Sequence, residues 1–285
     1  MKRVSMHAGR LQNNHEQNDA YFPEVSVHTS RHGSYSLEGR ILTNDPSKPA
    51  SVMVVHGARS DFSGNDKLIV PLHEKGLSIL SATISGHGVA GYQSDIPFSL
   101  DESLQEALAF SKLLQSNDCT LIGISMGGTT AVRLLQAEPH RFKRVVLFYP
   151  TAFPDEAYSV PFGTDEFRAI GNQKGAFLRS SFFDILSAFE GRILLIKGEY
   201  DGLNPADFQK GSENAVYTAT INGREIYSPI PPEVFSKIRA ERPDTEFFEL
   251  PGADHRFSVW FKDHPEDLDV IVQKLFNFIS REHTS

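Results

Sequence analysis

The chain has 285 residues, a length at which a single α/β domain of about 200–300 residues is ordinary. Hydrophobic residues make up 40% of the chain and charged residues 22%, close to globular averages, which excludes a disordered, collagen-like or fibrous protein. The net charge of −8, with no dense run of Lys and Arg, argues against nucleic acid as a partner.

Residues 1–24 are polar, and we expect them to form an arm outside a single domain at residues 25–285. The arm can be disordered, lie over the domain or reach a second subunit. It contains no apolar stretch typical of a secretory signal, and no apolar run in the chain is long enough for a transmembrane helix. The only cysteine, Cys119, excludes an intrachain disulfide and is expected to be a buried thiol. We therefore expect a cytoplasmic protein without integral membrane association, of undetermined oligomeric state.

Regular elements follow one another along most of the chain. Residues 24–43 alternate around a Gly-Ser turn and predict a β-hairpin at one sheet edge. Further strands are predicted at residues 50–57, 77–85, 119–125, 143–150, 192–201 and 245–252. Helices are predicted at residues 65–76, 99–116, 126–139 and 264–282, with Ser99 or Asp101 as the cap of the second. Strands that alternate with helices indicate a mostly parallel sheet flanked by helices.

The alternation stops between residues 151 and 190, after the sixth predicted strand. This segment is rich in phenylalanine, with Phe153, Phe162, Phe167, Phe177, Phe182, Phe183 and Phe189. These side chains can form a small core of the segment itself, face a substrate, or do both. A second irregular stretch, which includes residues 228–243, precedes the last strand.

Ser125 lies where an apolar strand is expected to turn into a helix, between Gly123 and Gly127. A side chain at such a sharp turn projects above the sheet edge, and the glycines leave room for the neighbouring strand and helix. The N–H groups that begin the following helix face any negative charge that develops there. The alternative is an inert serine on a glycine-rich turn.

A serine nucleophile needs a base, and the base needs an orienting carboxylate. Asp201 ends one predicted strand and His255 follows the last one, in the chain order serine, acid, histidine. Glu199 and Asp207 also lie near the acid position, and we interpret both as loop carboxylates. His56 and His87 follow strands, and we expect them to support loops rather than to act as the base.

The chain resembles the α/β-hydrolase family over residues 40–282 or so. The resemblance rests on four motifs in order, HGARS at 56–60, GISMGG at 123–128, GEYDGLNP at 198–205 and GADHRF at 252–257. The SGHG at residues 85–88 is similar to the lysophospholipase and monoacylglycerol-lipase branch. The resemblance implies an α/β-hydrolase fold with a mostly parallel central sheet flanked by helices, and it implies a cap at 151–190.

The resemblance also implies roles for single residues. Ser125 would be the nucleophile, His255 the general base and then the general acid, and Asp201 the carboxylate that holds the imidazole. The backbone N–H groups of Ala58 and Met126 would form the oxyanion hole.

Two positions depart from the lipase-like branch, so its substrates are not carried over. Arg59 replaces a common glycine, and Thr83 replaces a common aspartate. Arg59 can meet an anionic substrate group or remain a solvated loop arginine. Four residues are candidates for substrate binding: Arg59, Tyr149, Phe162 and Phe182.

Metal and cofactor chemistry find little support. The clustered ligand types at residues 263–269 begin a helix, where acidic side chains are expected from the helix dipole alone. GHG and GAR lack the spacing of a nucleotide loop, so neither a metal nor a cofactor is expected.

The predicted activity is that of a serine hydrolase, which cleaves a small-molecule carboxylic ester or thioester through an acyl-enzyme intermediate. Two alternatives stay open. One is an acyltransferase or carrier-linked thioesterase that uses the same triad, and the other is a non-catalytic binding protein with this fold.

Overall fold

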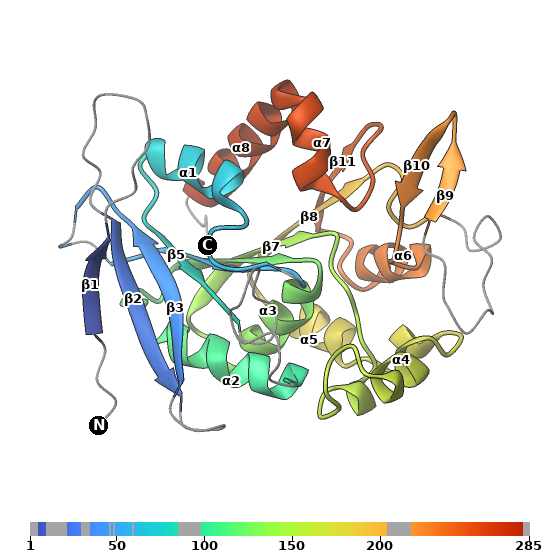
Figure 1. The fold of residues 1–285 in the computed structure, drawn as a ribbon, viewed down its shortest axis with the longest axis horizontal. Coiled ribbons are helices and arrows are strands. Elements are labelled where there is room, and N and C mark those ends of the chain that lie inside the picture. Colours follow the sequence, from blue (N-terminus) through green and yellow to red (C-terminus); the bar gives the residue numbers. More distant parts are fainter. Residues whose placement is uncertain are drawn as a thin grey trace.

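The computed structural model describes residues 5–9, 22–29, 35–45, 47, 49–58, 60–84, 98–203 and 218–281. Within these residues a nine-stranded sheet runs through the molecule in the order β1-β2-β3-β5-β4-β6-β7-β8-β11 (Figure 1). Its strands are β1 (Ser5–Gly9), β2 (Phe22–Thr29), β3 (Tyr35–Leu42), β4 (Val52–Val55), β5 (Ile79–Ala82), β6 (Cys119–Ile124), β7 (Phe142–Phe148), β8 (Arg192–Gly198) and β11 (Glu246–Leu250).

The sheet is mostly parallel, as expected. All neighbours from β5 to β11 in the sheet order run parallel, whereas β1, β2 and β3 pair antiparallel with one another and β3 pairs antiparallel with β5. Strands β4, β5 and β6 are buried along their whole length, which explains their continuous apolar sequences. Because β5 and β6 lie on opposite sides of β4, the sheet has its topological switch point there. Ligand sites of open α/β sheets form at the carboxyl ends of the strands at such a point.

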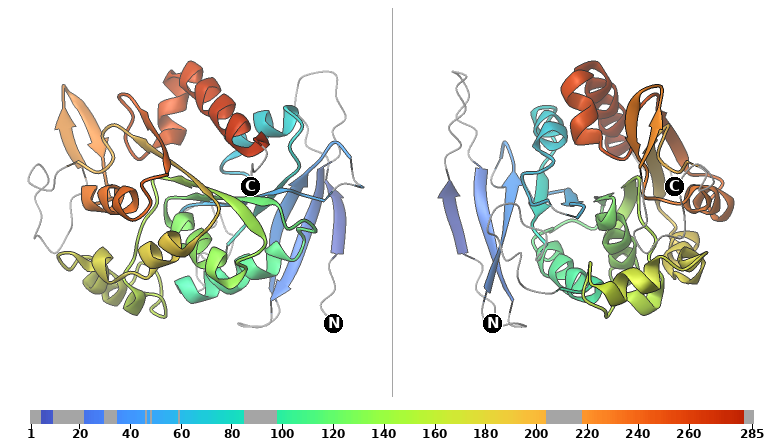
Figure 2. Two further views of the ribbon diagram at one scale, coloured as in Figure 1. Left: turned by 180° about the vertical axis from the view of Figure 1, so that it is seen from behind. Right: turned by 45° about the vertical axis from the view of Figure 1, so that its right-hand side comes forward.

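Helices cover both faces of the sheet (Figures 1 and 2). On one face α1 (Asp66–Glu74) packs against α8 (Pro265–Ser280), which α7 (Phe257–Asp263) precedes. On the other face α3 (Met126–Ala137) lies between α2 (Leu100–Ser111) and α5 (Phe182–Ala188), and α5 in turn contacts α6 (Pro232–Glu241). The expected cap of α2 is confirmed at Ser99, whose hydroxyl accepts a hydrogen bond from Glu102 N while the Glu102 carboxylate accepts one from Ser99 N.

The structure corrects several expectations. Ser5–Gly9 pairs with β2, and β2 begins at Phe22, so residues 5–9 and 22–24 of the expected arm at 1–24 belong to the sheet. The segment at 151–190, which was expected to follow the sixth strand, consequently follows the seventh. The expected irregular stretch at 228–243 contains α6, and a two-stranded sheet of β9 (Thr218–Ile221) and β10 (Arg224–Tyr227) precedes it.

The segment after β7 contains η1 (Asp155–Ala157), α4 (Asp165–Gly171) and η2 (Ala176–Arg179) before α5. Residues of its first part join Phe98 and Met126 in a second cluster, separate from the main core, which we call the aromatic cluster. Phe98, Met126, Tyr158 and Phe167 are buried in it, and Phe153 and Phe162 pack against them. Phe182 and Phe183 belong instead to the main core. Residues 182–188 therefore form part of the helical layer beneath the sheet and do not belong to the aromatic cluster.

Phe182→Ala is expected to lower the free energy of unfolding by about 3–5 kcal/mol, because it removes a side chain that is 0% exposed from the main core. Chemical denaturation measures this directly. A matched change, Leu178→Ala, removes a side chain that is 61% exposed and is expected to alter the free energy by less than about 0.5 kcal/mol. Equal stability of the two variants would contradict the placement of Phe182.

Candidate active site

Ser125 occupies a strained turn between β6 and α3. Its backbone angles are φ 52° and ψ −118°, a conformation that residues other than glycine rarely adopt. Both backbone polar groups of Ser125 are hydrogen-bonded to the chain at the end of β7. Ser125 N donates to Phe148 O at 2.9 Å, and Ser125 O accepts from Thr151 N at 3.1 Å. The strain thus places the hydroxyl at the carboxyl end of β6, beside the switch point.

The glycines around Ser125 are required by close packing. A β-carbon on Gly123 would lie 2.7 Å from Ala131 Cβ and 2.8 Å from Gly127 O. One on Gly127 would collide with the carbonyl oxygens of Val55 and His56. The helix can therefore start directly against β4 only because both positions lack side chains.

The three residues predicted to form the triad lie in one hydrogen-bonded chain. The Ser125 Oγ is 2.9 Å from His255 Nε2, and His255 Nδ1 is 2.8 Å from Asp201 Oδ2. The imidazole donates from Nδ1 to the carboxylate, so Nε2 is the acceptor that faces the serine hydroxyl. This arrangement can take a proton from Ser125 and return it to a leaving group.

Asp201 is completely buried and its carboxylate oxygen Oδ1 has no hydrogen-bond partner among the described residues. Burial raises the pKa of the Asp201 carboxyl, while His255 and Lys197 oppose the rise. The Lys197 ammonium also holds the turn that contains Asp201, residues 199–203, which we call the acid turn. It donates to Gly198 O at 2.9 Å and to Asp201 O at 3.1 Å. His255 is partly accessible, with its side chain 11% exposed.

Acid and base meet because their strands are neighbours. β8 and β11 run parallel, and Gly198 at the end of β8 pairs with Leu250 at the end of β11. The two turns that follow are joined by a hydrogen bond from Tyr200 N to Ala253 O at 2.9 Å. Glu199, interpreted from the sequence as a loop carboxylate, is exposed and accepts from Gly252 N at 2.7 Å.

The turn at the carboxyl end of β4, residues 56–58, lies against Ser125. A β-carbon on Gly57 would be 3.2 Å from Ser125 Cβ. His56 is buried, donates from Nδ1 to Gly57 O at 2.7 Å and accepts from Ile84 N at its Nε2 at 2.9 Å. Burial lowers the pKa of His56, which keeps the ring neutral and able to accept the Ile84 hydrogen bond. His56 thereby ties this turn to the chain after β5, the loop-supporting role expected for it.

Tyr149 contacts the histidine. Its ring centroid lies 4.5 Å from that of His255 and 4.7 Å from that of Phe257, both edge-on. Its backbone has a φ of 34°, and burial raises the pKa of its hydroxyl. Nothing in the sequence indicated that this candidate substrate residue packs on the imidazole.

Comparisons with known proteins support the same family. The sequence pattern of a family described as "Serine aminopeptidase, S33" matches residues 46–176. A search of the curated proteins finds no match. The fold is similar to that of a putative hydrolase from Agrobacterium vitis S4, with a TM-score of 0.57 and 17% identity over 98% of this chain and 100% of that chain. It is also similar to a serine hydrolase from Cycloclasticus zankles, with a TM-score of 0.56 and 14% identity over 90% of this chain and 100% of that chain. The chain has the α/β-hydrolase fold.

The other candidate residues have varied positions. Ala58 lies exposed at the end of the turn after β4. Met126 begins α3, and its side chain lies in the aromatic cluster. Phe162 lies in that cluster, 4.9 Å from the Phe167 ring and 5.5 Å from the Phe98 ring. Phe182 is a correction, because complete burial in the main core leaves it no surface for a substrate. Arg59, His87 and Asp207 lie outside the described residues.

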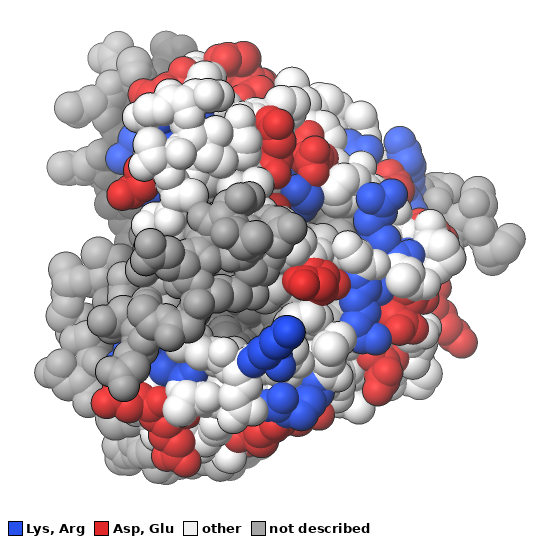
Figure 3. All heavy atoms as spheres, turned by 90° about the vertical axis from the view of Figure 1, so that its right-hand side faces the viewer, with Lys and Arg blue, Asp and Glu red and all other residues white. Residues whose placement is uncertain are grey.

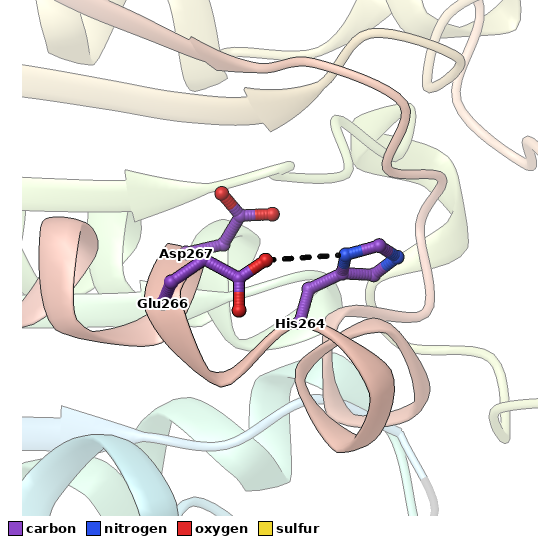
Figure 4. Close-up of side chains that lie close together, drawn as sticks. All are labelled: His264, Glu266 and Asp267. Carbon is purple, nitrogen blue, oxygen red and sulfur yellow. Dashed lines mark ion pairs between the residues drawn. The ribbon is translucent and has the colours of Figure 1, made fainter.

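Among the described residues, one cluster of metal-ligand types is found, at the start of α8 (Figure 4). His264 Nδ1 is 3.5 Å from Glu266 Oε1, and Asp267 accepts a hydrogen bond from Trp260 Nε1 at 2.7 Å. The His264 ring also stacks on Trp260, with centroids 3.8 Å apart. Glu266 and Asp267 lie in the first turn of α8, as the helix-start interpretation of residues 263–269 expected.

The end of the molecule that carries α4, β9 and β10 shows acidic and basic side chains interspersed over its described surface (Figure 3). None of the described helices is both long and apolar enough to cross a membrane.

A surface groove of about 710 Å³ lies between α1, α8 and β11, and its lining includes Pro71, Phe248 and Val270. Its lining includes none of the residues of the candidate site.

Proposed function

We propose that this α/β hydrolase is a serine hydrolase that cleaves a carboxylic ester or thioester through an acyl-enzyme intermediate. The observation that carries the proposal is the continuous chain from the Ser125 hydroxyl through the His255 imidazole to the buried Asp201 carboxylate. The three groups come from the ends of three different strands, β6, β11 and β8, so the sheet itself sets their spacing.

In the first half-reaction, the Ser125 Oγ attacks the carbonyl carbon while His255 Nε2 takes its proton. Asp201 stabilises the imidazolium that forms, and the backbone N–H groups of Ala58 and Met126 stabilise the negative charge on the carbonyl oxygen. The imidazolium then gives its proton to the leaving alcohol or thiol. In the second half-reaction a water molecule, activated by the same nitrogen, attacks the acyl-serine and releases the acid.

The cap favours an apolar acyl group. The Met126 side chain, whose own backbone N–H belongs to the proposed oxyanion hole, is buried among Phe98, Tyr158 and Phe167. Phe153 and Phe162 are only partly buried at this cluster. The rings therefore offer an apolar surface on the α3 side of the proposed nucleophile.

The test is turnover of p-nitrophenyl esters from acetate to decanoate, together with acyl thioesters of the same chain lengths. Release of the free acid at rates well above those of Ser125→Ala is expected for part of the series. The products are then analysed after addition of an acceptor alcohol, because a conjugate in place of the acid would identify an acyltransferase. No turnover above the Ser125→Ala control, with any ester or thioester, would reject the proposed activity.

A further inference from the structure

The β-hairpin of β9 and β10 lies outside the four hydrolase motifs, between the acid turn and α6. Its strands pair antiparallel through a two-residue Asn222-Gly223 turn with positive φ at both positions, 52° and 77°. That geometry is the type I′ turn, which matches the natural twist of a hairpin. The hairpin lies at the end of the molecule away from β1 (Figure 1). The end of β10 is hydrogen-bonded to the turn that contains His255, residues 252–256, which we call the histidine turn.

Tyr227, the last residue of β10, holds the histidine turn through its main chain. His255 N donates to Tyr227 O at 3.1 Å, and Tyr227 N donates to Asp254 Oδ2 at 2.9 Å. The other oxygen of that carboxylate, Asp254 Oδ1, accepts from Arg256 N at 2.8 Å. The residues on both sides of His255 are therefore fixed by the Asp254 side chain, which is itself only 8% exposed.

The charge of Asp254 is also satisfied locally. Burial tends to raise the pKa of this carboxyl, but hydrogen bonds from Arg256 and from the backbone at Tyr227 hold it below its ordinary value. Arg256 donates to Asp254 Oδ2 from Nε at 3.0 Å and from Nη2 at 2.6 Å. A carboxylate that stays ionised keeps acceptors for both backbone N–H groups over a wide pH range.

Ser228, the next residue, holds the acid turn. Its hydroxyl oxygen accepts from Gly202 N at 2.9 Å and from Leu203 N at 3.2 Å, in the two residues that directly follow Asp201. Ser228 is 6% exposed, so water has little access to these N–H groups. Two consecutive residues, Tyr227 and Ser228, thus bind the histidine turn and the acid turn.

We propose that the segment Tyr227–Ser228, together with Asp254, is a clasp that sets His255 at the correct distance from Asp201 and Ser125. Asp254 and Ser228 are positioning residues, since they act through the backbone around the acid and the histidine and not on the substrate. The inference rests on the proposed function. Proton transfer depends on two contacts of 2.9 Å and 2.8 Å, and misplacement by about 1 Å can cost on the order of 100-fold in rate.

The clasp is tested with Asp254→Ala, Asp254→Asn and Ser228→Ala. Asp254→Ala is expected to lower kcat by about 10–100-fold while KM changes less than about twofold, because the substrate surface is untouched. Asp254→Asn is expected to fall between Asp254→Ala and wild type, because its amide nitrogen would face one of the two backbone N–H donors. Glu225→Ala is the control, since it removes the other carboxylate that contacts the Arg256 side chain, at 3.1 Å from Nη1, and leaves the backbone hydrogen bonds of Asp254 and Ser228 in place.

A second readout does not depend on turnover. The proton on His255 Nδ1 gives a downfield ¹H NMR resonance in ¹⁵N-labelled protein, assigned by its loss in His255→Ala. This resonance is expected to persist in Glu225→Ala and to weaken or vanish in Asp254→Ala, Asp254→Asn and Ser228→Ala, with the remaining spectrum still dispersed. Should Asp254→Ala fail to fold, the nearly isosteric Asp254→Asn and Ser228→Ala decide the question.

Wild-type kcat and an intact resonance in folded clasp variants would overturn the clasp while leaving the serine hydrolase in place. The converse outcome is a wild-type protein that turns over no ester yet loses the resonance in the clasp variants. That result would reject the proposed activity and retain the clasp.

Discussion

Ser125→Ala and His255→Ala are each expected to lower kcat by on the order of 10⁵–10⁶-fold towards the best ester of the series. The alanine at 125 removes the attacking oxygen, and the alanine at 255 removes the group that accepts its proton at 2.9 Å. Because the two residues act as a unit, the double variant should be only slightly slower than either single variant. Steady-state kinetics with p-nitrophenyl esters measures all three.

Both alanine variants should remain folded, since Ser125 and His255 are partly accessible and neither belongs to the main core. Circular dichroism and the thermal midpoint control for this. A Ser125→Ala protein with a rate near that of wild type would show that the esterase chemistry does not use this serine.

Asp201→Asn is expected to lower kcat by about 10⁴-fold. An asparagine fills the same volume, but its amide group can donate to His255 Nδ1, which favours the imidazole tautomer that carries its proton on Nε2. That nitrogen would then face the Ser125 hydroxyl as a donor and could not act as the base. The structural contact at 2.8 Å would survive while its chemical use is lost.

The same substitution separates function from stability. The pKa of Asp201 is raised in the folded state, mainly by burial, so the folded protein holds this proton more tightly than the unfolded chain. Ionisation of Asp201 therefore costs folding free energy, and this cost is full at any pH above the raised pKa. The cost shrinks as the pH falls through the raised pKa and disappears below the ordinary pKa of the carboxyl. Asp201→Asn should have a thermal midpoint at neutral pH equal to or above that of wild type. A midpoint well below wild type would contradict the assignment of burial as the main cause.

Local sequence signals predicted much of the fold because they reflect local physics. Continuous apolar runs such as 50–57 and 119–125 became the buried strands β4 and β6, and Ser99 capped α2 through the capping box. The strained turn at Ser125 was expected from its two glycines, and it has the positive φ that such a turn requires. The spacing of Asp201 and His255 after two strands carried information because those strands are parallel neighbours.

What sequence could not provide depends on contacts between distant segments. Phe162 and Phe182 are both phenylalanines of one irregular stretch of sequence. The first lies in the aromatic cluster and the second in the main core, and this difference depends on the path of the chain in three dimensions. The helix α6 was missed because prolines surround its start, although a proline at the first helical position is favourable. Ser228 and Asp254 carried no signal of this role, since the β10 and acid-turn backbone contacts that define it join groups 25 to 27 residues apart.

The most direct measurement is the intact mass of the protein after incubation with a fluorophosphonate, followed by peptide mapping. The reagent needs a hydroxyl activated by an adjacent base, and Ser125 with His255 is the proposed pair. One adduct per chain on the peptide that contains Ser125, absent from Ser125→Ala and strongly slowed in His255→Ala, is the expected result. An unmodified protein, or an adduct on a different residue, would contradict the proposed serine hydrolase.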